Sequence, residues 1–327
     1  MNTTIENQTE QQVLVDVSPG GRLNPWQQKK QQSINLAESH YRLSNSLGDF
    51  DSKAGKILEC GSWLEFRVYE NGEKKLNRAS FCKYRLCPMC AWRRSLKLFG
   101  QASQVLDEAQ NQGYVFLFVT LTVKNCLPGQ LAETIDTLFG AYNRLIRRKN
   151  FIHGAFRALE VTHNLKFGSV SFDTYHPHLH CIWLVKPSYF THGNYVSQAR
   201  LADMWQRALG VDYSPICHIT RAATAGKGHI REVSKYSVKP VDILHPDPGL
   251  TDSAVWHLDH ALKGRRLISW TGVLKKIRAS FGFDDPETGD LINVDGEISN
   301  PDLGYILETY SWRLGYNQYI KKGSKND

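Results

Sequence analysis

The stretch "HPHLHCIWLV", residues 176–185, places three histidines ahead of an apolar run. Side chains alternate between the two faces of a strand, so His178 and His180 project together. Leu179 faces the other way, toward a core. His176 shares the face of the other two histidines only if the strand begins that early. Two imidazoles two positions apart on one strand can bind one divalent ion.

A pair of surface histidines at the start of a strand is the simpler interpretation, and a third ligand would decide against it. Glu160 stands in the apolar stretch "ALEV" of the preceding predicted strand, 156–163. A carboxylate there needs a partner, because an unpaired buried charge is expensive. If the two strands pair as a hairpin, Glu160 reaches the histidine face. Two histidines and one carboxylate with open positions form a catalytic metal site, and phosphate and water ligands would suit Mg²⁺ or Mn²⁺.

The surrounding pattern predicts the fold class of this 327-residue chain. "YVFLFVTLTV", residues 114–123, is an apolar run typical of a buried strand. Helical spacing is found in four segments: 99–112, 129–149, 197–209 and 228–239. Strand, helix, strand, strand and helix in this order predict an α+β fold.

Composition divides the chain into four parts. Residues 1–55 are rich in Gln, Asn and Ser, and we expect a mostly disordered tail with some helix. Residues 56–98 hold four cysteines and form a predicted zinc-binding module. Residues 99–245 form the predicted core. The break "PDPG" precedes a separate C-terminal helical element within 246–327, which has a basic helix followed by an acidic segment.

"GHIREVSKYSVKPVD", residues 228–242, predicts a helix that ends before Pro240. Glu232, Tyr236 and Lys239 then share one helix face. An amphipathic helix with salt bridges is the alternative. Near a metal, Tyr236 becomes a nucleophile toward a phosphate, which gives a phosphotyrosine ester. Lys239 would neutralise developing charge, and Glu232 would act as general base for a second nucleophile.

The cysteines predict a second metal site. "CKYRLCPMC" contains Cys82, Cys87 and Cys90, and Cys60 lies upstream in "ECGSW". Four thiolates with this spacing suit a closed, tetrahedral, structural Zn²⁺ site. A set of buried free cysteines is the alternative. No run reaches membrane-spanning length and the start lacks a signal pattern, so we expect a cytoplasmic protein with reduced cysteines and no membrane contact.

Charge points to a polyanionic partner. The formal net charge is +8. Three basic runs without acids, 82–97, 144–149 and 261–278, are interleaved with aromatic residues, which favours nucleic acid. The candidate DNA contacts are Arg93, Arg94, Arg147, Arg148, Arg265 and Arg266. The acidic segment 284–308 either caps the basic surface or contacts a host helicase.

Together these motifs resemble the replication initiator (Rep) proteins of small rolling-circle plasmids, in the HUH endonuclease superfamily. The resemblance runs from about residue 56 to 283. The motifs that carry it are "FVTLTVKN" (118–125), "HPHLHCIWLV", "EVSKYSVK" (232–239), "FCKYRLCPMCAWRRS" (81–95) and "GRRLISWTGVLKKI" (264–277). The resemblance implies an HUH core, a central antiparallel sheet flanked by helices, with the histidines on a middle strand.

The resemblance also implies roles. His178 and His180 match the metal ligands, Glu160 the acidic third ligand and Tyr236 the nicking tyrosine. Glu232 matches a glutamate that activates the nucleophile ending the cycle. Thr120, Thr122 and Asn125 match the first motif, with a structural or DNA-positioning role.

The implied activity is that of a site-specific nicking-joining endonuclease. It binds the plasmid's double-strand origin and cuts a strand that is single-stranded at the nick site, leaving a 5′-phosphotyrosine and a free 3′-OH primer. A second cleavage and strand joining end the round, and water activated by Glu232 is favoured over a second tyrosine. The implied partners are origin DNA, a host helicase and the replication machinery.

Three other functions remain open. A DNA-binding regulator with a zinc knuckle and no catalysis explains the charge and the cysteines. A relaxase or transposase would use the same chemistry in another role. A metal-dependent hydrolase would not need Tyr236. The sequence leaves open the origin sequence, the native metal and the oligomeric state, including a homodimer.

Overall fold

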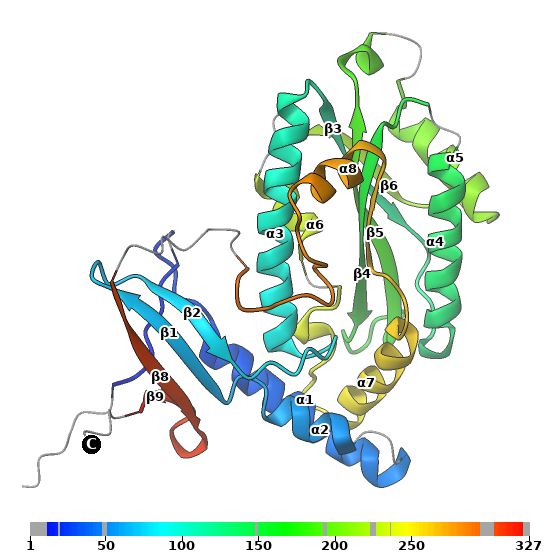
Figure 1. Cartoon of the computed structure of the whole chain (residues 1–327). Coiled ribbons are helices and arrows are strands. Elements are labelled where there is room, and N and C mark those ends of the chain that lie inside the picture. Colours follow the sequence, from blue (N-terminus) through cyan, green and yellow to red (C-terminus); the bar gives the residue numbers. More distant parts are fainter. Residues whose placement is uncertain are drawn as a thin grey trace, which may run out of the picture.

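The computed structural model describes residues 12–18, 20–47, 51–147, 150–191, 195–222, 227–235, 237–294 and 304–322. Within these ranges the chain forms two antiparallel sheets with helices packed against them (Figure 1). The α+β prediction is confirmed. No helix in the described ranges is long and apolar enough to cross a bilayer.

The larger sheet has five strands, and the histidine strand lies in its middle. The order is β6 (Cys217–Ala222), β3 (Val115–Thr122), β5 (Thr174–Val185), β4 (Gly154–Asn164) and β7 (Ile268–Thr271). All neighbours are antiparallel. The predicted hairpin is therefore confirmed, because β4 and β5 pair along their whole length.

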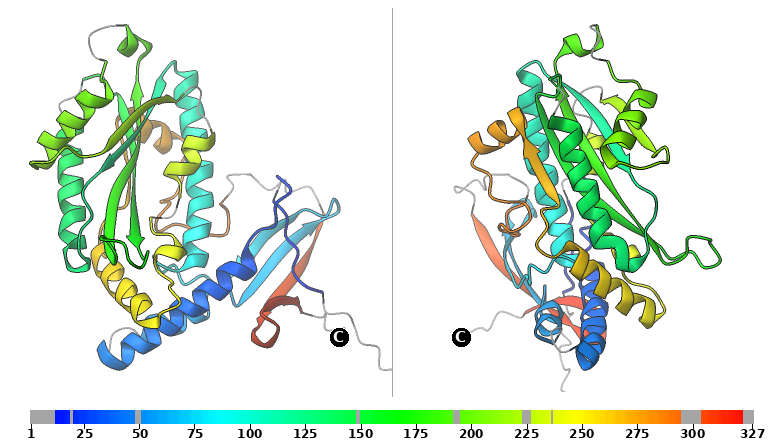
Figure 2. Two further views of the ribbon diagram at one scale, coloured as in Figure 1. Left: turned by 180° about the vertical axis from the view of Figure 1, so that it is seen from behind. Right: turned by 90° about the vertical axis from the view of Figure 1, so that its right-hand side faces the viewer.

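Alternation along β5 places two apolar sets on opposite faces of this sheet. Leu179, Cys181 and Trp183 enter the larger core. That core is covered by α4 (Leu131–Arg147), α5 (Gln198–Leu209) and α7 (Pro248–Leu262). Ile182 and Leu184 enter a smaller core on the other face. That face carries α3 (Pro88–Asn111), α6 (Lys227–Val233) and α8 (Gly272–Ser280). Figure 2 shows the sheet and its helices from behind and from the side. Both faces of β5 are thus covered.

The smaller sheet brings together two strands from the first quarter of the sequence and two from residues 305–321. Its order is β2 (Lys74–Ala79), β1 (Trp63–Tyr69), β8 (Tyr305–Arg313) and β9 (Gln318–Lys321). Trp26, the first residue of α1 (Trp26–Leu47), packs edge-on against Phe66 of β1 and Trp92 of α3. Short 3₁₀ turns complete the structure at Pro128–Gln130, Pro187–Phe190, Pro240–Asp242 and Leu314–Tyr316.

The expectation of a mostly disordered tail over 1–55 is wrong for the second half of that range. Residues 26–47 form α1, and α2 (Asp51–Leu58) follows. Helix α1 buries polar side chains that find partners inside the protein. Lys30 is 2% exposed and donates to the carbonyls of Leu58 and Cys60. Polar composition therefore did not mean an exposed segment. Residues 1–11 lie outside the described part of the chain.

The C-terminal region differs from the separate helical element predicted for 246–327. Helix α7 packs against α1 and α4, β7 completes the large sheet and α8 packs on α3. Strands β8 and β9 belong to the small sheet, where β8 pairs with β1 in register from Trp63↔Ser311 to Tyr69↔Tyr305. The predicted start of α3 is also wrong, since the helix begins at Pro88 rather than at residue 99.

Candidate functional site

The predicted metal ligands lie together on the middle of the large sheet. Glu160 of β4 is the direct cross-strand neighbour of His178 on β5. The Nε2 atoms of His178 and His180 lie 3.4 Å and 2.8 Å from Oε2 of Glu160. The three residues are 4–9% exposed. Since both histidines are buried and face a carboxylate, the alternative of a surface histidine pair is wrong.

The donor set fits a divalent ion. One ligand atom from each of Glu160, His178 and His180 can be chosen so that all lie within 4.8 Å of one another. Nδ1 of His178 faces the carbonyl of His176 at 3.1 Å, which leaves Nε2 directed at the site. Such a second contact fixes the ring orientation of a metal-binding histidine. His176 stacks on His178 but is outside the cluster. The geometry therefore accommodates a divalent ion.

A cation from outside the two strands completes the site. Nζ of Lys239 lies 2.5 Å from Oε1 of Glu160. Burial would raise the pKa of Glu160, but hydrogen bonds from His178, His180 and Lys239 outweigh it and hold that pKa well below its usual range. Burial lowers the pKa of Lys239, but the contact with Glu160 together with the negative charges of Asp242 and Glu232 outweighs it, so the net shift is upward. Glu160 is therefore a carboxylate and Lys239 an ammonium at neutral pH.

Glu232 lies at the edge of the same site. Its Oε1 is 3.9 Å from Nε2 of His180, and its Oε2 pairs with Lys235. The side chain is 36% exposed, so water reaches this carboxylate, unlike that of Glu160.

The helix predicted over 228–239 is wrong beyond its first half. Helix α6 ends at Val233, and Pro240 opens a 3₁₀ turn. The carbonyl of Ser237 accepts a 2.7 Å hydrogen bond from the amide of Val161, next to Glu160 on β4. This bond to the strand replaces a continued helix, so Glu232 and Lys239 reach the site from different elements. The predicted nucleophile, Tyr236, lies outside the described residues.

The four predicted zinc ligands also come together. Sγ of Cys60 lies 3.5 Å from that of Cys90 and 3.6 Å from that of Cys87, and Cys82 lies 3.7 Å from Cys90. A tetrahedron with Zn–S bonds of about 2.3 Å has sulfur atoms about 3.8 Å apart. The cluster fits a closed metal site better than four independent buried thiols. Lys30, which the sequence did not single out, contacts the carbonyl of Cys60.

A family model described as Replication protein matches residues 73–320. The chain belongs to this replication protein family. "Protein rep" of Bacillus amyloliquefaciens is 35% identical, with 95% of this chain and 97% of the relative covered. "Protein rep" of Streptococcus pneumoniae is 37% identical, with 98% and 99% covered. A "Replication protein" of Staphylococcus aureus is 32% identical over 68% of this chain and 98% of the relative. No solved structure matches significantly.

In this replication protein the first motif has a visible structural part. Thr122 is paired in register with His178, and its hydroxyl donates to the carbonyl of Ile216. Asn125 donates to the hydroxyl of Thr174 at 2.8 Å, which ties the end of β3 to the start of β5. Thr120 is opposite His180. Phe118 stacks on His180 with ring centroids 5.9 Å apart, a contact that sequence reasoning missed.

Of the arginines predicted to contact DNA, the two that follow the cysteine-rich segment 82–90 are bound internally. Arg93 is 6% exposed and donates to the carbonyls of Leu291 and Ile292. Arg94 donates to the carbonyls of Tyr84 and Glu287. The guanidinium of Arg93 therefore does not face solvent.

The remaining arginines lie nearer the surface. Arg265 pairs with Asp136 of α4 at 2.5 Å. Arg266 pairs with Asp285 at 2.6 Å, although its side chain is 63% exposed. Arg147 is exposed at the end of α4. Arg148 lies outside the described residues. A DNA contact remains a prediction for all six arginines.

Proposed function

We propose that this replication protein initiates rolling-circle replication of a plasmid by nicking its origin through HUH-type tyrosine chemistry. The observation that carries the proposal is the buried cluster of Glu160, His178 and His180, with Lys239 attached to it. Ser237, the residue that follows Tyr236 in the sequence, accepts a hydrogen bond from β4 at its carbonyl, and Lys239 contacts Glu160 of the same strand. Anchoring of the chain directly after position 236 to the strand that carries Glu160 supports Tyr236 as the nucleophile.

The proposed step is a transesterification. The phenolic oxygen of Tyr236 forms a bond to the phosphorus of one phosphodiester, and the bond from phosphorus to the 3′ oxygen breaks. The phenolic proton goes to solvent or a nearby base, and the leaving 3′ oxygen takes up a proton to become a 3′-OH. A 5′-phosphotyrosine remains. One phosphoester replaces another, so no ATP is consumed.

The chain's own groups have distinct parts in this step. A divalent ion held by Glu160, His178 and His180 would polarise the non-bridging oxygens of the phosphate. Lys239 offsets charge that develops on the phosphate. Glu232, which is reached by water, is suited to activate a water molecule for the second cleavage. The buried protein carboxylate and two imidazoles leave coordination positions for phosphate oxygen and water, as Mg²⁺ and Mn²⁺ prefer. The Cys60, Cys82, Cys87 and Cys90 cluster is proposed to hold structural Zn²⁺.

A non-catalytic regulator with a zinc knuckle is the main competing function. It has no use for a buried acid between two histidines, since such a group costs stability unless it serves a site. A relaxase or transposase with the same chemistry would form the same covalent bond and differ only in its DNA target.

A covalent-adduct assay tests the proposal. Labelled single-stranded DNA covering the plasmid origin is incubated with the protein and Mn²⁺, then separated under denaturing conditions. We expect a protein–DNA adduct that is lost in Tyr236→Phe and strongly reduced in His178→Ala. The matched controls are Tyr195→Phe, an exposed tyrosine, and His176→Ala, which is outside the ligand cluster. An adduct of normal yield with Tyr236→Phe would overturn the assignment.

A further inference from the structure

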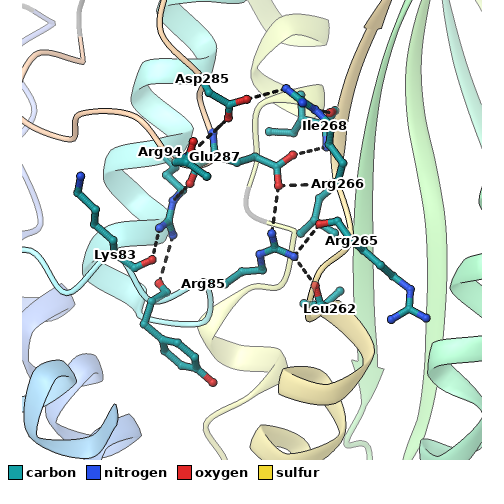
Figure 3. A network of polar contacts seen from close by, with 12 residues as sticks. Lys83, Arg85, Arg94, Leu262, Arg265, Arg266, Ile268, Asp285 and Glu287 are labelled. Carbon is teal, nitrogen blue, oxygen red and sulfur yellow. Dashed lines mark hydrogen bonds and ion pairs between the residues drawn. The ribbon is translucent and has the colours of Figure 1, made fainter. Parts of the chain in front are cut away.

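An anion-binding site on this protein is occupied by one of its own glutamates. Oε1 of Glu287 accepts a 2.9 Å hydrogen bond from the amide of Ile268. Oε2 accepts from the amide of Leu267 and from the guanidinium of Arg85, both at 3.3 Å (Figure 3). The Glu287 side chain is 12% exposed. Consecutive backbone N–H groups beside a guanidinium are a general arrangement for binding phosphate.

Arg85 is held in place for this role. One of its nitrogens donates to the carbonyls of Leu262, at the end of α7, and Arg265, in the turn before β7. The second nitrogen is left to meet Glu287. The site is therefore built from the segment between α7 and β7 and from Arg85 of the cysteine-rich segment 82–90, and Glu287 contributes only the anion.

Two further acids of the same segment form ion pairs with neighbouring basic side chains. Asp285 pairs with Arg266 at 2.6 Å, and Asp284 pairs with the buried Lys97 of α3. These basic residues belong to two of the three acid-free basic runs, 82–97 and 261–278. The segment 284–287 thus places three carboxylates next to three basic side chains. A DNA backbone likewise presents a row of negative charges, one on each phosphate.

A pocket extends from this site to residues 234–238, the segment that contains the proposed nucleophile. It is lined by Arg85, Arg94, Leu98, Ser234, Ser237 and Leu267, and Glu287 is also part of its lining. Ser234 is 3% exposed, and its hydroxyl has no hydrogen-bond partner among the described residues. A buried hydroxyl without a partner costs stability unless a ligand or water satisfies it.

We infer that the site of Arg85, Leu267 and Ile268 binds a backbone phosphate of the DNA strand, and that segment 284–287 occupies it in the DNA-free protein. The inference rests on the proposed function. A phosphodiester carries one negative charge and two non-bridging oxygens, so it can take both positions of the Glu287 carboxylate. The adjoining pocket with Ser234 then receives the next part of the strand on its way to Tyr236.

Binding of a fluorescent single-stranded oligonucleotide of mixed sequence tests the inference. Glu287→Gln keeps the shape of the segment and weakens its hold. We expect affinity to rise about threefold to tenfold, and the slope of log affinity against log salt to steepen by about one phosphate contact. Asp107→Asn, an exposed acid on α3, removes the same charge elsewhere. It should change affinity less than about twofold. Equal effects of the two variants would overturn the inference.

Hydrogen exchange on the unaltered protein gives a second measurement, which does not depend on how well a variant folds. DNA should accelerate exchange in residues 284–293 while the amides of Leu267 and Ile268 stay protected. Continued protection of 284–293 under saturating DNA would contradict displacement. Neither measurement requires cleavage, so a protein that binds in this way but forms no Tyr236 adduct would refute only the proposed nicking.

Discussion

The ammonium of Lys239 lies 2.5 Å from the carboxylate of Glu160, the acid that also faces both site histidines. This pair neutralises the cluster when no divalent ion is bound. An ion bound to Glu160 must share that carboxylate with Lys239 and meets its positive charge. The same lysine is thus expected to stabilise the metal-free protein and to weaken metal binding.

We predict that Lys239→Met raises the affinity for Mn²⁺ severalfold and lowers the stability of the metal-free protein. Removing one partner of a fully buried pair costs about 3–5 kcal/mol. Since Lys239 is 36% exposed, the loss should be nearer about 1–2 kcal/mol. Mn²⁺ titration and urea unfolding without metal measure the two effects. Lys235→Met, which removes an exposed lysine paired with Glu232, is the control. Weaker Mn²⁺ binding by Lys239→Met would show that the lysine supports the ion instead.

The four-cysteine cluster gives a prediction about metal content. Because the sulfur atoms already lie at tetrahedral spacing, the purified protein should contain about one zinc per chain. Cys90→Ser should lose that zinc and lower the melting temperature, since α3 begins at this cluster. Cys217→Ser alters a buried cysteine outside the cluster and should retain the zinc. Elemental analysis and thermal unfolding measure both results. Full zinc retention in Cys90→Ser would exclude the site.

The sequence predicted the parts of the fold that depend on local pattern. The strands around Phe118, Glu160 and His180 follow short apolar stretches of the sequence, and the structure has them where expected. Glu160 could be identified as a candidate ligand because a carboxylate in an apolar strand needs a charged or hydrogen-bonding partner. The length and burial of helix α1 were not predicted, because its buried positions include Lys30 and Ser33, which contact residues distant in the sequence.

Long-range pairing explains the other differences. Strand β8 is stabilised by β1, which precedes it by more than two hundred residues, and no local pattern reports such a neighbour. The early end of α6 depends on the bond from the amide of Val161 to the carbonyl of Ser237. Glu232 and Lys239 have helical spacing in the sequence. The tertiary contact with β4 nevertheless replaces the helical conformation after Val233.

A close backbone contact at the β4–β7 edge predicts an unusually sensitive glycine. Gly272 has φ +57°, and a Cβ there would lie 2.2 Å from the carbonyl oxygen of His153. Gly264 has φ +71° with open space around it. Gly264→Ala should therefore cost only the left-handed strain of about 1–2 kcal/mol. Gly272→Ala must also displace β7 from β4 and should cost clearly more. Urea unfolding of the two variants compares them, and equal losses would contradict the contact.

The small sheet contains a carboxylate whose ionisation should make stability depend on pH. Burial raises the pKa of Glu308, but contacts from Lys321, Tyr310 and Lys74 outweigh it and lower the pKa to about 2. An unfolded glutamate titrates near about 4.3. The depressed pKa adds stability that is fully present above about pH 5 and is lost as pH falls toward the folded value.

Glu308→Gln should therefore be less stable than the unaltered protein at neutral pH, and the difference should shrink as pH falls below about 4.3. The contacts that cause the shift are the ion pairs of Glu308 with Lys74 and Lys321, which tie β8 to β2 and β9. Glu70→Gln, at an exposed acid after β1, should show no such trend. Urea unfolding at a series of pH values measures the difference. A difference between Glu308→Gln and the unaltered protein that stays constant down to about pH 3 would mean that these ion pairs do not stabilise the sheet.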